Sequence, residues 1–109
     1  MNLDKLNANH EKERKEYWKM RAKRLAQMQR DQNQIVRHCI ILNSKTHEIL
    51  KALLNAQRQE WQRMENDDFD LLLHMQELER EAYLEKERTQ RQLMDLVNRG
   101  RQTEMEREP

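Results

Sequence analysis

Glycine and proline are almost missing from this 109-residue chain: each occurs once, at Gly100 and Pro109, near the C-terminal end. Turns in compact folds recruit these two residue types most strongly, so the first 99 residues have little with which to build several tight turns. Hydrophobic residues make up 36% of the chain, below the roughly 45–50% of an average globular domain. The two shortages together argue against a compact fold with a thick core.

Cysteine is equally scarce, because Cys39 is the only one and cannot form an internal disulfide. The first residues, Met1–Asp4, lack the apolar run of a secretory signal. No stretch approaches the ~20 apolar residues that a membrane-spanning helix needs. We therefore expect an intracellular protein of a reducing compartment that does not act in a membrane.

The residue patterns that carry catalysis or bind cofactors are also absent. No glycine-rich phosphate loop, no paired CxxC and no Ser-His-Asp setting occurs. Asp67, Asp68 and Asp70 lack the glycine turn of a calcium loop. Neighbouring His38 and Cys39 point about 100° apart on a helix, which does not suit a shared metal ion. We expect a non-enzymatic protein without cofactor, metal or small-molecule substrate.

Charge, by contrast, is abundant and nearly balanced: 38% of residues are charged, with 21 basic and 20 acidic side chains. This balance disfavours a general nucleic-acid or membrane-surface binder, which usually carries a strong basic excess. The distribution is uneven, since residues 5–24 hold eight basic and three acidic side chains, whereas residues 58–88 hold five basic and ten acidic ones. Such polarity can orient the chain on a partner or pair two copies antiparallel.

From residue 25 onward, apolar residues recur at alternating steps of three and four, as in the a and d positions of a coiled coil. The first series consists of Leu25, Met28, Ile35, Cys39, Leu42, Ile49, Leu53 and Ala56. A second series, one residue out of step, consists of Leu50, Leu54, Trp61, Met64, Leu71, Met75, Leu78 and Ala82. The shift indicates a change in supercoil or in the face that meets a partner. The combined stripe suits a helix covered by more than one neighbour.

These patterns predict an all-α, coiled-coil-like chain with one long, nearly continuous helix and little or no independent core. Candidate breaks lie near 43–47 and 66–68, where asparagine, serine and aspartate are good N-cap residues. Neither place has glycine or proline, so we expect the helix to continue through both; a break at 66–68 would give a helical hairpin instead. We divide the chain into a basic helical segment (1–24), an apolar-striped helix (25–97) and a frayed tail (98–109).

The apolar stripe is too long for so thin a chain to cover, so we expect a partner to cover it. Trp18 and Trp61 are the most informative residues, because aromatic anchors are enriched where proteins dock, although both side chains can equally well fill a coiled-coil seam. The residues expected to bind the partner are Trp18, Leu25, Ile35, Leu42, Ile49, Leu53, Leu54, Trp61, Met64, Leu71, Met75 and Leu78.

The 13-residue segment 53–65 resembles the helical signature of small microtubule inner proteins of ciliary and flagellar axonemal doublets. Leu53, Leu54 and Trp61 match the signature in place, Gln57 stands where the family has a glutamate, and the final pair of the signature is reversed. The resemblance implies a structural, non-catalytic protein of the cytoplasmic cytoskeleton, located in the axoneme of a cilium or flagellum. It also implies docking on the tubulin lattice and on neighbouring filament proteins, with Trp61 as an anchor.

Two other functions stay open. One is a coiled-coil adaptor subunit of another intracellular complex, such as a centrosomal or trafficking assembly. The other is an RNA- or ribosome-associated helix that binds through the basic segment 12–24, where Tyr17 and Trp18 offer stacking surfaces. We rank nucleic acid below protein partners, because a solvated helix face explains the basic segment more simply.

Overall fold

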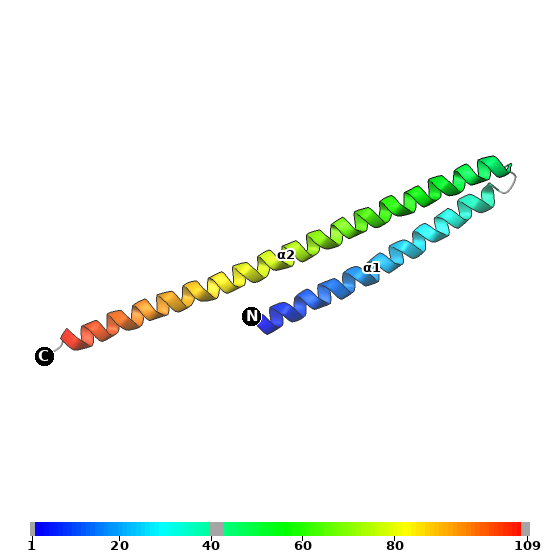
Figure 1. The fold of residues 1–109 in the computed structure, drawn as a ribbon. Coiled ribbons are helices and arrows are strands. Elements are labelled where there is room, and N and C mark those ends of the chain that lie inside the picture. Colours follow the sequence, from blue (N-terminus) through cyan, green and yellow to red (C-terminus); the bar gives the residue numbers. More distant parts are fainter. Residues whose placement is uncertain (1, 40–42, 108–109) are drawn as a thin grey trace.

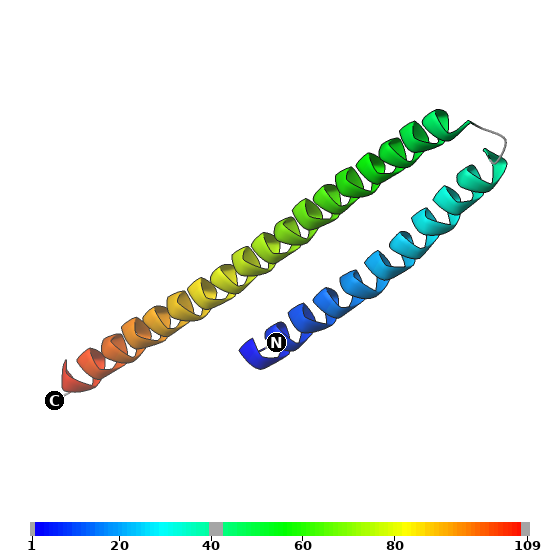
Figure 2. The same ribbon diagram turned by 45° about the vertical axis from the view of Figure 1, so that its right-hand side comes forward.

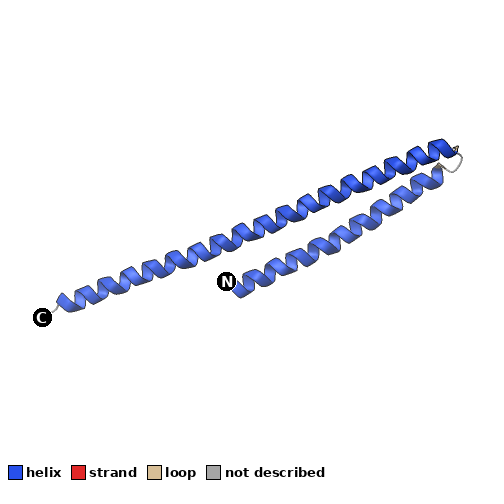
Figure 3. Ribbon diagram, in the orientation of Figure 1, coloured by secondary structure: helices blue, strands red, loops and turns tan. Residues whose placement is uncertain are grey.

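The computed structural model describes residues 2–39 and 43–107, with side chains placed as far as residue 101. These residues form two antiparallel α-helices, α1 (Leu3–His38) and α2 (Ser44–Arg107), which lie side by side as a hairpin (Figure 1). The molecule is a thin rod of 102 × 18 × 12 Å. Figure 3 shows two helices and no strand in the described part, and Leu6, which is 8% exposed, is its one buried apolar side chain. The prediction of an all-α chain with little independent core is confirmed.

The two helices part at the first of the two candidate breaks. At the end of α1, the Cys39 N–H donates to the carbonyls of Ile35 and Val36, at 3.1 and 3.2 Å. At the start of α2, the Asn43 side chain accepts a hydrogen bond of 2.9 Å from the Thr46 N–H, which is the geometry of an N-cap. The chain is therefore two helices instead of one continuous helix, because the Asn43 cap starts a new helix without any glycine or proline.

The second candidate break, at 66–68, is not used, and α2 continues straight through it. Two of the three side chains that could have capped a helix there have other partners. Asn66 accepts a hydrogen bond of 2.9 Å from Arg21 on α1, and Asp67 lies 3.3 Å from Arg63 one turn earlier on α2. Residues with high N-cap propensity thus remain inside a helix when their side chains are engaged elsewhere.

At its C-terminal end, α2 reaches Arg107 and so passes the helix end expected at 98–100. Gly100 has no positive φ and therefore does not form a left-handed cap. The residues around it are mostly glutamate, glutamine and arginine, which are good helix formers. In both ribbon views the last part of α2 extends well beyond the N-terminus of α1 (Figures 1 and 2).

The helices meet along a seam with an eleven-residue period, made of three ladders. One ladder is apolar or aromatic, and it consists of Leu6, Tyr17, Met28, Cys39, Leu50, Trp61, Leu72 and Tyr83. The second is polar apart from one leucine, and it consists of His10, Arg21, Gln32, Asn43, Leu54, Glu65, Gln76 and Glu87. The third includes Leu3, Arg14, Leu25, Val36, His47 and Phe69. Apart from Ala26, every described side chain that is not exposed lies on one of these ladders.

This period corrects the heptad interpretation. Eleven residues in three turns give about 3.67 residues per turn, close to the value of a straight helix, so the two helices pair with little supercoiling. The one-residue shift between the two apolar series follows from the same period, because an eleven-residue repeat contains one more step of four than a heptad does. Of the first series, Leu25, Met28 and Cys39 lie on the seam, whereas Ile35, Ile49 and Leu53 are exposed.

Candidate docking surface

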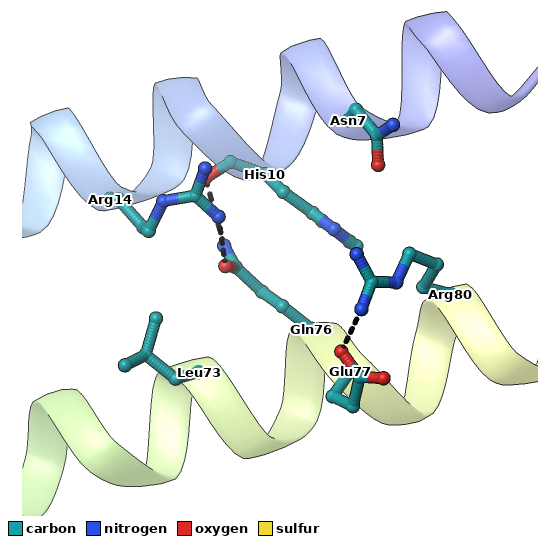
Figure 4. A pocket seen from close by; sticks show the side chains of 7 residues that line it. All are labelled: Asn7, His10, Arg14, Leu73, Gln76, Glu77 and Arg80. Carbon is teal, nitrogen blue, oxygen red and sulfur yellow. Dashed lines mark hydrogen bonds and ion pairs between the residues drawn. The ribbon is translucent and has the colours of Figure 1, made fainter.

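The first fixed point of the seam is a polar clamp near the N-terminus of α1 (Figure 4). Gln76 of α2, only 4% exposed, donates from Nε2 to the His10 carbonyl at 2.9 Å, and its Oε1 accepts from Arg14 at 2.8 Å. The His10 ring, also buried, lies 3.1 Å from a carboxylate oxygen of Glu79. Because both ends of the Gln76 amide are bonded to α1, this residue holds the two helices in one register.

A shallow groove beside this clamp is lined by Asn7, His10, Arg14, Leu73, Gln76, Glu77 and Arg80. Its polar side chains already bond to one another: Arg14 donates to Gln76, and Arg80 donates to Glu77 within α2 (Figure 4). The groove is therefore a by-product of the helix pairing, and its chemistry does not indicate a ligand site.

A second clamp of the same design lies near the turn, with the roles of the helices exchanged. Gln32 of α1, 5% exposed, donates from Nε2 to the Leu54 carbonyl at 2.9 Å, and its Oε1 accepts from Arg58 at 3.2 Å. In each clamp the arginine is four residues beyond the residue whose carbonyl accepts. Buried amide groups of this kind favour one register, because any other pairing would leave them without partners.

Between the clamps lies an ion cluster centred on Glu65, which is 5% exposed. Arg24 donates two hydrogen bonds to its carboxylate, at 2.6 and 2.7 Å, in the strong two-pronged arrangement. The Tyr17 hydroxyl lies 2.8 Å from the same carboxylate and 2.5 Å from the Glu65 carbonyl oxygen. The bonds from Arg24 lower the pKa of Glu65 although burial opposes this, while burial and the bond to Glu65 raise the pKa of Tyr17.

Aromatic rings gather around this cluster. The ring centroids of Tyr17 and Trp18 each lie 5.1 Å from that of Phe69, and the Arg21 guanidinium lies 4.8 Å from the Trp18 ring and 5.8 Å from the Trp61 ring. Both tryptophans therefore contact Arg21 inside the hairpin. Trp61 contributes to the seam, whereas Trp18 keeps half of its surface exposed.

A second apolar stripe of α2 remains uncovered, and we call it the docking stripe. Five of its members directly precede a seam residue, which places the stripe about 100° around the helix from the seam. Its side chains are 46–63% exposed, and they are Ile49, Leu53, Met64, Leu71, Met75, Leu78, Leu93 and Val97. From Ile49 to Val97 the stripe runs for about 72 Å at 1.5 Å per residue.

The corresponding face of α1 is polar apart from Met20. A shift of 44 residues, four periods of the seam, relates equivalent positions of the two helices. The α1 residues equivalent to the first six members of the docking stripe are Lys5, Asn9, Met20, Gln27, Asp31 and Gln34. Only α2 thus carries the stripe, which Glu60 and Lys86 interrupt at two of its repeat positions. Exposed apolar patches of this kind mark interaction sites in proteins.

The residues that the sequence predicted to bind a partner fall into two groups in the structure, one on the seam and one exposed. Three of them, Leu25, Leu54 and Trp61, lie on the seam, where the other helix of the same chain covers them. Leu42 lies outside the described residues. The exposed ones are Trp18, Ile35, Ile49, Leu53, Met64, Leu71, Met75 and Leu78.

Two members of the docking stripe, Leu93 and Val97, belong to the apolar-striped helix predicted over 25–97 but were not among the residues predicted to bind a partner. The heptad series ends at Ala82 and does not reach them. An eleven-residue step does, because it leads from Leu71 through Ala82 to Leu93. The clamps were missed as well, since glutamine and arginine at these spacings look like ordinary surface residues until the register brings them together.

No family model, curated protein or solved structure matches the chain. Among the described helices, none combines the length and the apolar character that crossing a membrane requires. Within residues 2–39 and 43–101, no three His, Cys, Asp or Glu side chains gather in a group that could hold a metal ion.

Proposed function

We propose that this protein is a non-catalytic structural component of a ciliary or flagellar axonemal microtubule assembly, where it docks on tubulin and on neighbouring filament proteins. The docking stripe is the observation that carries the proposal. Burying one large apolar side chain stabilises a complex by up to about 1.5–3 kcal/mol, so eight of them in line supply ample energy for attachment. A straight stripe on a register-locked rod suits a partner that is itself long and regular, such as a filament.

The axonemal part of the proposal rests on the resemblance of segment 53–65 to microtubule inner proteins. The geometry supports a division of the residues of this segment between two tasks. Leu53 and Met64 lie on the docking stripe, whereas Leu54 and Trp61 lie on the seam. In this proposal Leu53 and Met64 contact the lattice, and Trp61 holds α1 against α2 instead of serving as the lattice anchor that the resemblance implied.

The nucleic-acid alternative has less support. Arg14, Arg21 and Arg24 hydrogen-bond to α2, which removes three of the basic side chains from the free surface. The rings of Tyr17 and Trp18 pack on Phe69, so part of the stacking surface of that alternative is engaged, although Trp18 stays half exposed. What remains is a set of exposed lysines, of which Lys15 pairs with Glu11 at 3.2 Å.

The test compares two double variants in multiciliated cells. Leu53→Gln with Leu71→Gln removes two side chains of the docking stripe; Leu73→Gln with Leu84→Gln removes two leucines, 40% and 39% exposed, from the opposite flank of α2. Tagged protein is followed by imaging and by its retention on axonemes after detergent and salt extraction. We expect the parent and the control along the whole axoneme, and the stripe variant washed out with unchanged helical circular dichroism.

Two results would overturn the proposal. If the stripe variant were retained as firmly as the control, docking would not use the stripe. If the parent protein were excluded from cilia and gathered at centrosomes, vesicles or ribosomes, the axonemal assignment would be wrong and the adaptor or the nucleic-acid function would take its place.

A further inference from the structure

The eleven-residue repeat of the seam continues from α1 into α2 without a shift. On the apolar ladder, Cys39 of α1 and Leu50 of α2 are separated by one period of eleven residues. On the polar ladder, Gln32, Asn43 and Leu54 are separated by two such periods. A hairpin does not require this agreement, because after a turn the second helix can present its seam at any point of the repeat. A single uninterrupted helix does require it, since only then do all seam residues share one face.

The two clamps repeat with the same eleven-residue period as the ladders. Gln32 and Gln76 are 44 residues apart, and so are their arginine partners Arg14 and Arg58. Four periods of eleven relate one clamp to the other, so α1 and α2 present equivalent pairing faces. A face that repeats along one straight helix pairs with a second copy of itself in antiparallel orientation just as it pairs within the hairpin.

We propose that two copies of this chain exchange helices, each opening at the turn into one long helix, so that α1 of one copy pairs with α2 of the other. Both clamps and the Glu65 cluster then form with the same partners, across copies. Since His10 is level with Gln76, Asn43 of the two copies comes level at the centre of the dimer.

The residue types at the turn permit this exchange. Residues 39–43 contain no glycine and no proline, so no residue there prevents an uninterrupted helix. No residue of the described ranges 2–39 and 43–107 has a positive φ. Exchange of an identical element between copies is a low-cost route to a dimer, because it preserves the contacts of the monomer. The docking stripe takes no part in it, so this inference stands or falls apart from the proposed function.

Cross-linking between two differently marked copies tests the exchange. Asn7 and Arg80 line the same groove from opposite helices, and neither takes part in a clamp. In a Cys39→Ser background, one copy carries Asn7→Cys and a larger tag, and the other carries Arg80→Cys. The full-length proteins are unfolded together, refolded, and treated with a short bismaleimide. A covalent heterodimer is expected. Its absence would refute the exchange if the double variant Asn7→Cys with Arg80→Cys, on one chain, cross-linked without a change in mass.

Two turn variants give a second, independent measurement. Ser44 is the first residue of α2, where proline is favoured in a hairpin but interrupts a continuous helix, so Ser44→Pro should give monomers about 102 Å long. Asn43→Ala removes the cap and should favour the dimer. With 64 residues from Asn43 to Arg107 on either side of the centre, the exchanged dimer spans about 190 Å. If small-angle scattering gave monomers near 102 Å for the parent and for Asn43→Ala alike, the exchange would be excluded.

Discussion

At the scale of single residues, the Glu65 carboxylate is the most buried charge of the hairpin, and its hydrogen bonds make the stability depend on pH. Its pKa is lowered in the folded chain, so its contribution is fully present above the ordinary value of 4.5 and is lost as the pH falls through the lowered pKa. Tyr17 acts in the opposite sense. Its pKa is raised, so its contribution is present below pH 10 and is lost as the pH rises further.

Replacing Glu65 by glutamine tests this assignment. Glu65→Gln removes the two-pronged bond from Arg24, which should cost about 1.5–3 kcal/mol of unfolding free energy at neutral pH. The loss is not larger because the Arg24 side chain is 43% exposed and regains water. The measurement is the urea midpoint between pH 3 and pH 7. We expect the two proteins to differ at pH 7 and to converge in acid; curves that stay parallel down to pH 3 would contradict the role given to Glu65.

Gly100 is a residue at which the chain can be stabilised. It lies inside α2 with ordinary helical backbone, and an added Cβ would meet no atom within 4 Å. Gly100→Ala should therefore stabilise the end of α2 by about 0.5–1 kcal/mol, because glycine loses more backbone freedom than alanine in a helix. Amide hydrogen exchange around residue 100 reports this directly. Unchanged exchange rates would mean that the helix ends before Gly100 in solution.

At the scale of the helices, the sequence predicted the helical content and the apolar stripe but not their arrangement. The sequence offered N-cap residues at Asn43 and at 66–68. N-cap propensity alone favoured a helix break at 66–68, where three such residues follow one another. The outcome depended on tertiary contacts, because Asn66 is engaged by Arg21 of the other helix. The clamps depend in the same way on register, which no local pattern around Gln32 or Gln76 reveals.

The buried glutamines of the clamps should lower the stability of the hairpin while they specify its register. Leucine at Gln32 and Gln76 would bury apolar surface where amide groups now lie, and buried polar groups often cost more than apolar replacements of similar size. We expect the variant Gln32→Leu with Gln76→Leu to unfold at a higher temperature than the parent. With the register no longer specified, it should also populate several oligomeric states, as seen by light scattering after gel filtration. A variant that stayed as uniform in mass as the parent would show that other contacts set the register.

At the scale of the whole molecule, the hairpin separates two kinds of surface on α2. The seam is rich in hydrogen bonds and ion pairs, which select one pairing, while the docking stripe is apolar and faces away from α1. A chain that folded back on its apolar stripe would need no partner. This chain does fold back, but along a face about 100° from the docking stripe, so folding leaves that stripe uncovered.

The last part of α2 adds to this uncovered surface. Because His10 is level with Gln76, Leu3 is level with Tyr83, and α2 continues from there without α1 beside it (Figures 1 and 2). The described side chains from residue 88 to residue 101 are all exposed, including Leu93 and Val97 of the docking stripe. A lone helix is marginally stable in water, so this segment gains the most from a partner.

Thiol reactivity at adjacent positions of α2 tests the central claim most directly. In a Cys39→Ser background, Leu71→Cys places a thiol on the docking stripe, Leu72→Cys places one on the seam, and Gln62→Cys serves as an exposed control on the opposite flank. In the free protein, the thiols at 71 and 62 should react rapidly with a maleimide and the one at 72 slowly. In isolated axonemes, the thiol at 71 alone should become protected. If it remained as reactive as the thiol at 62, the stripe would not be the surface that binds the partner.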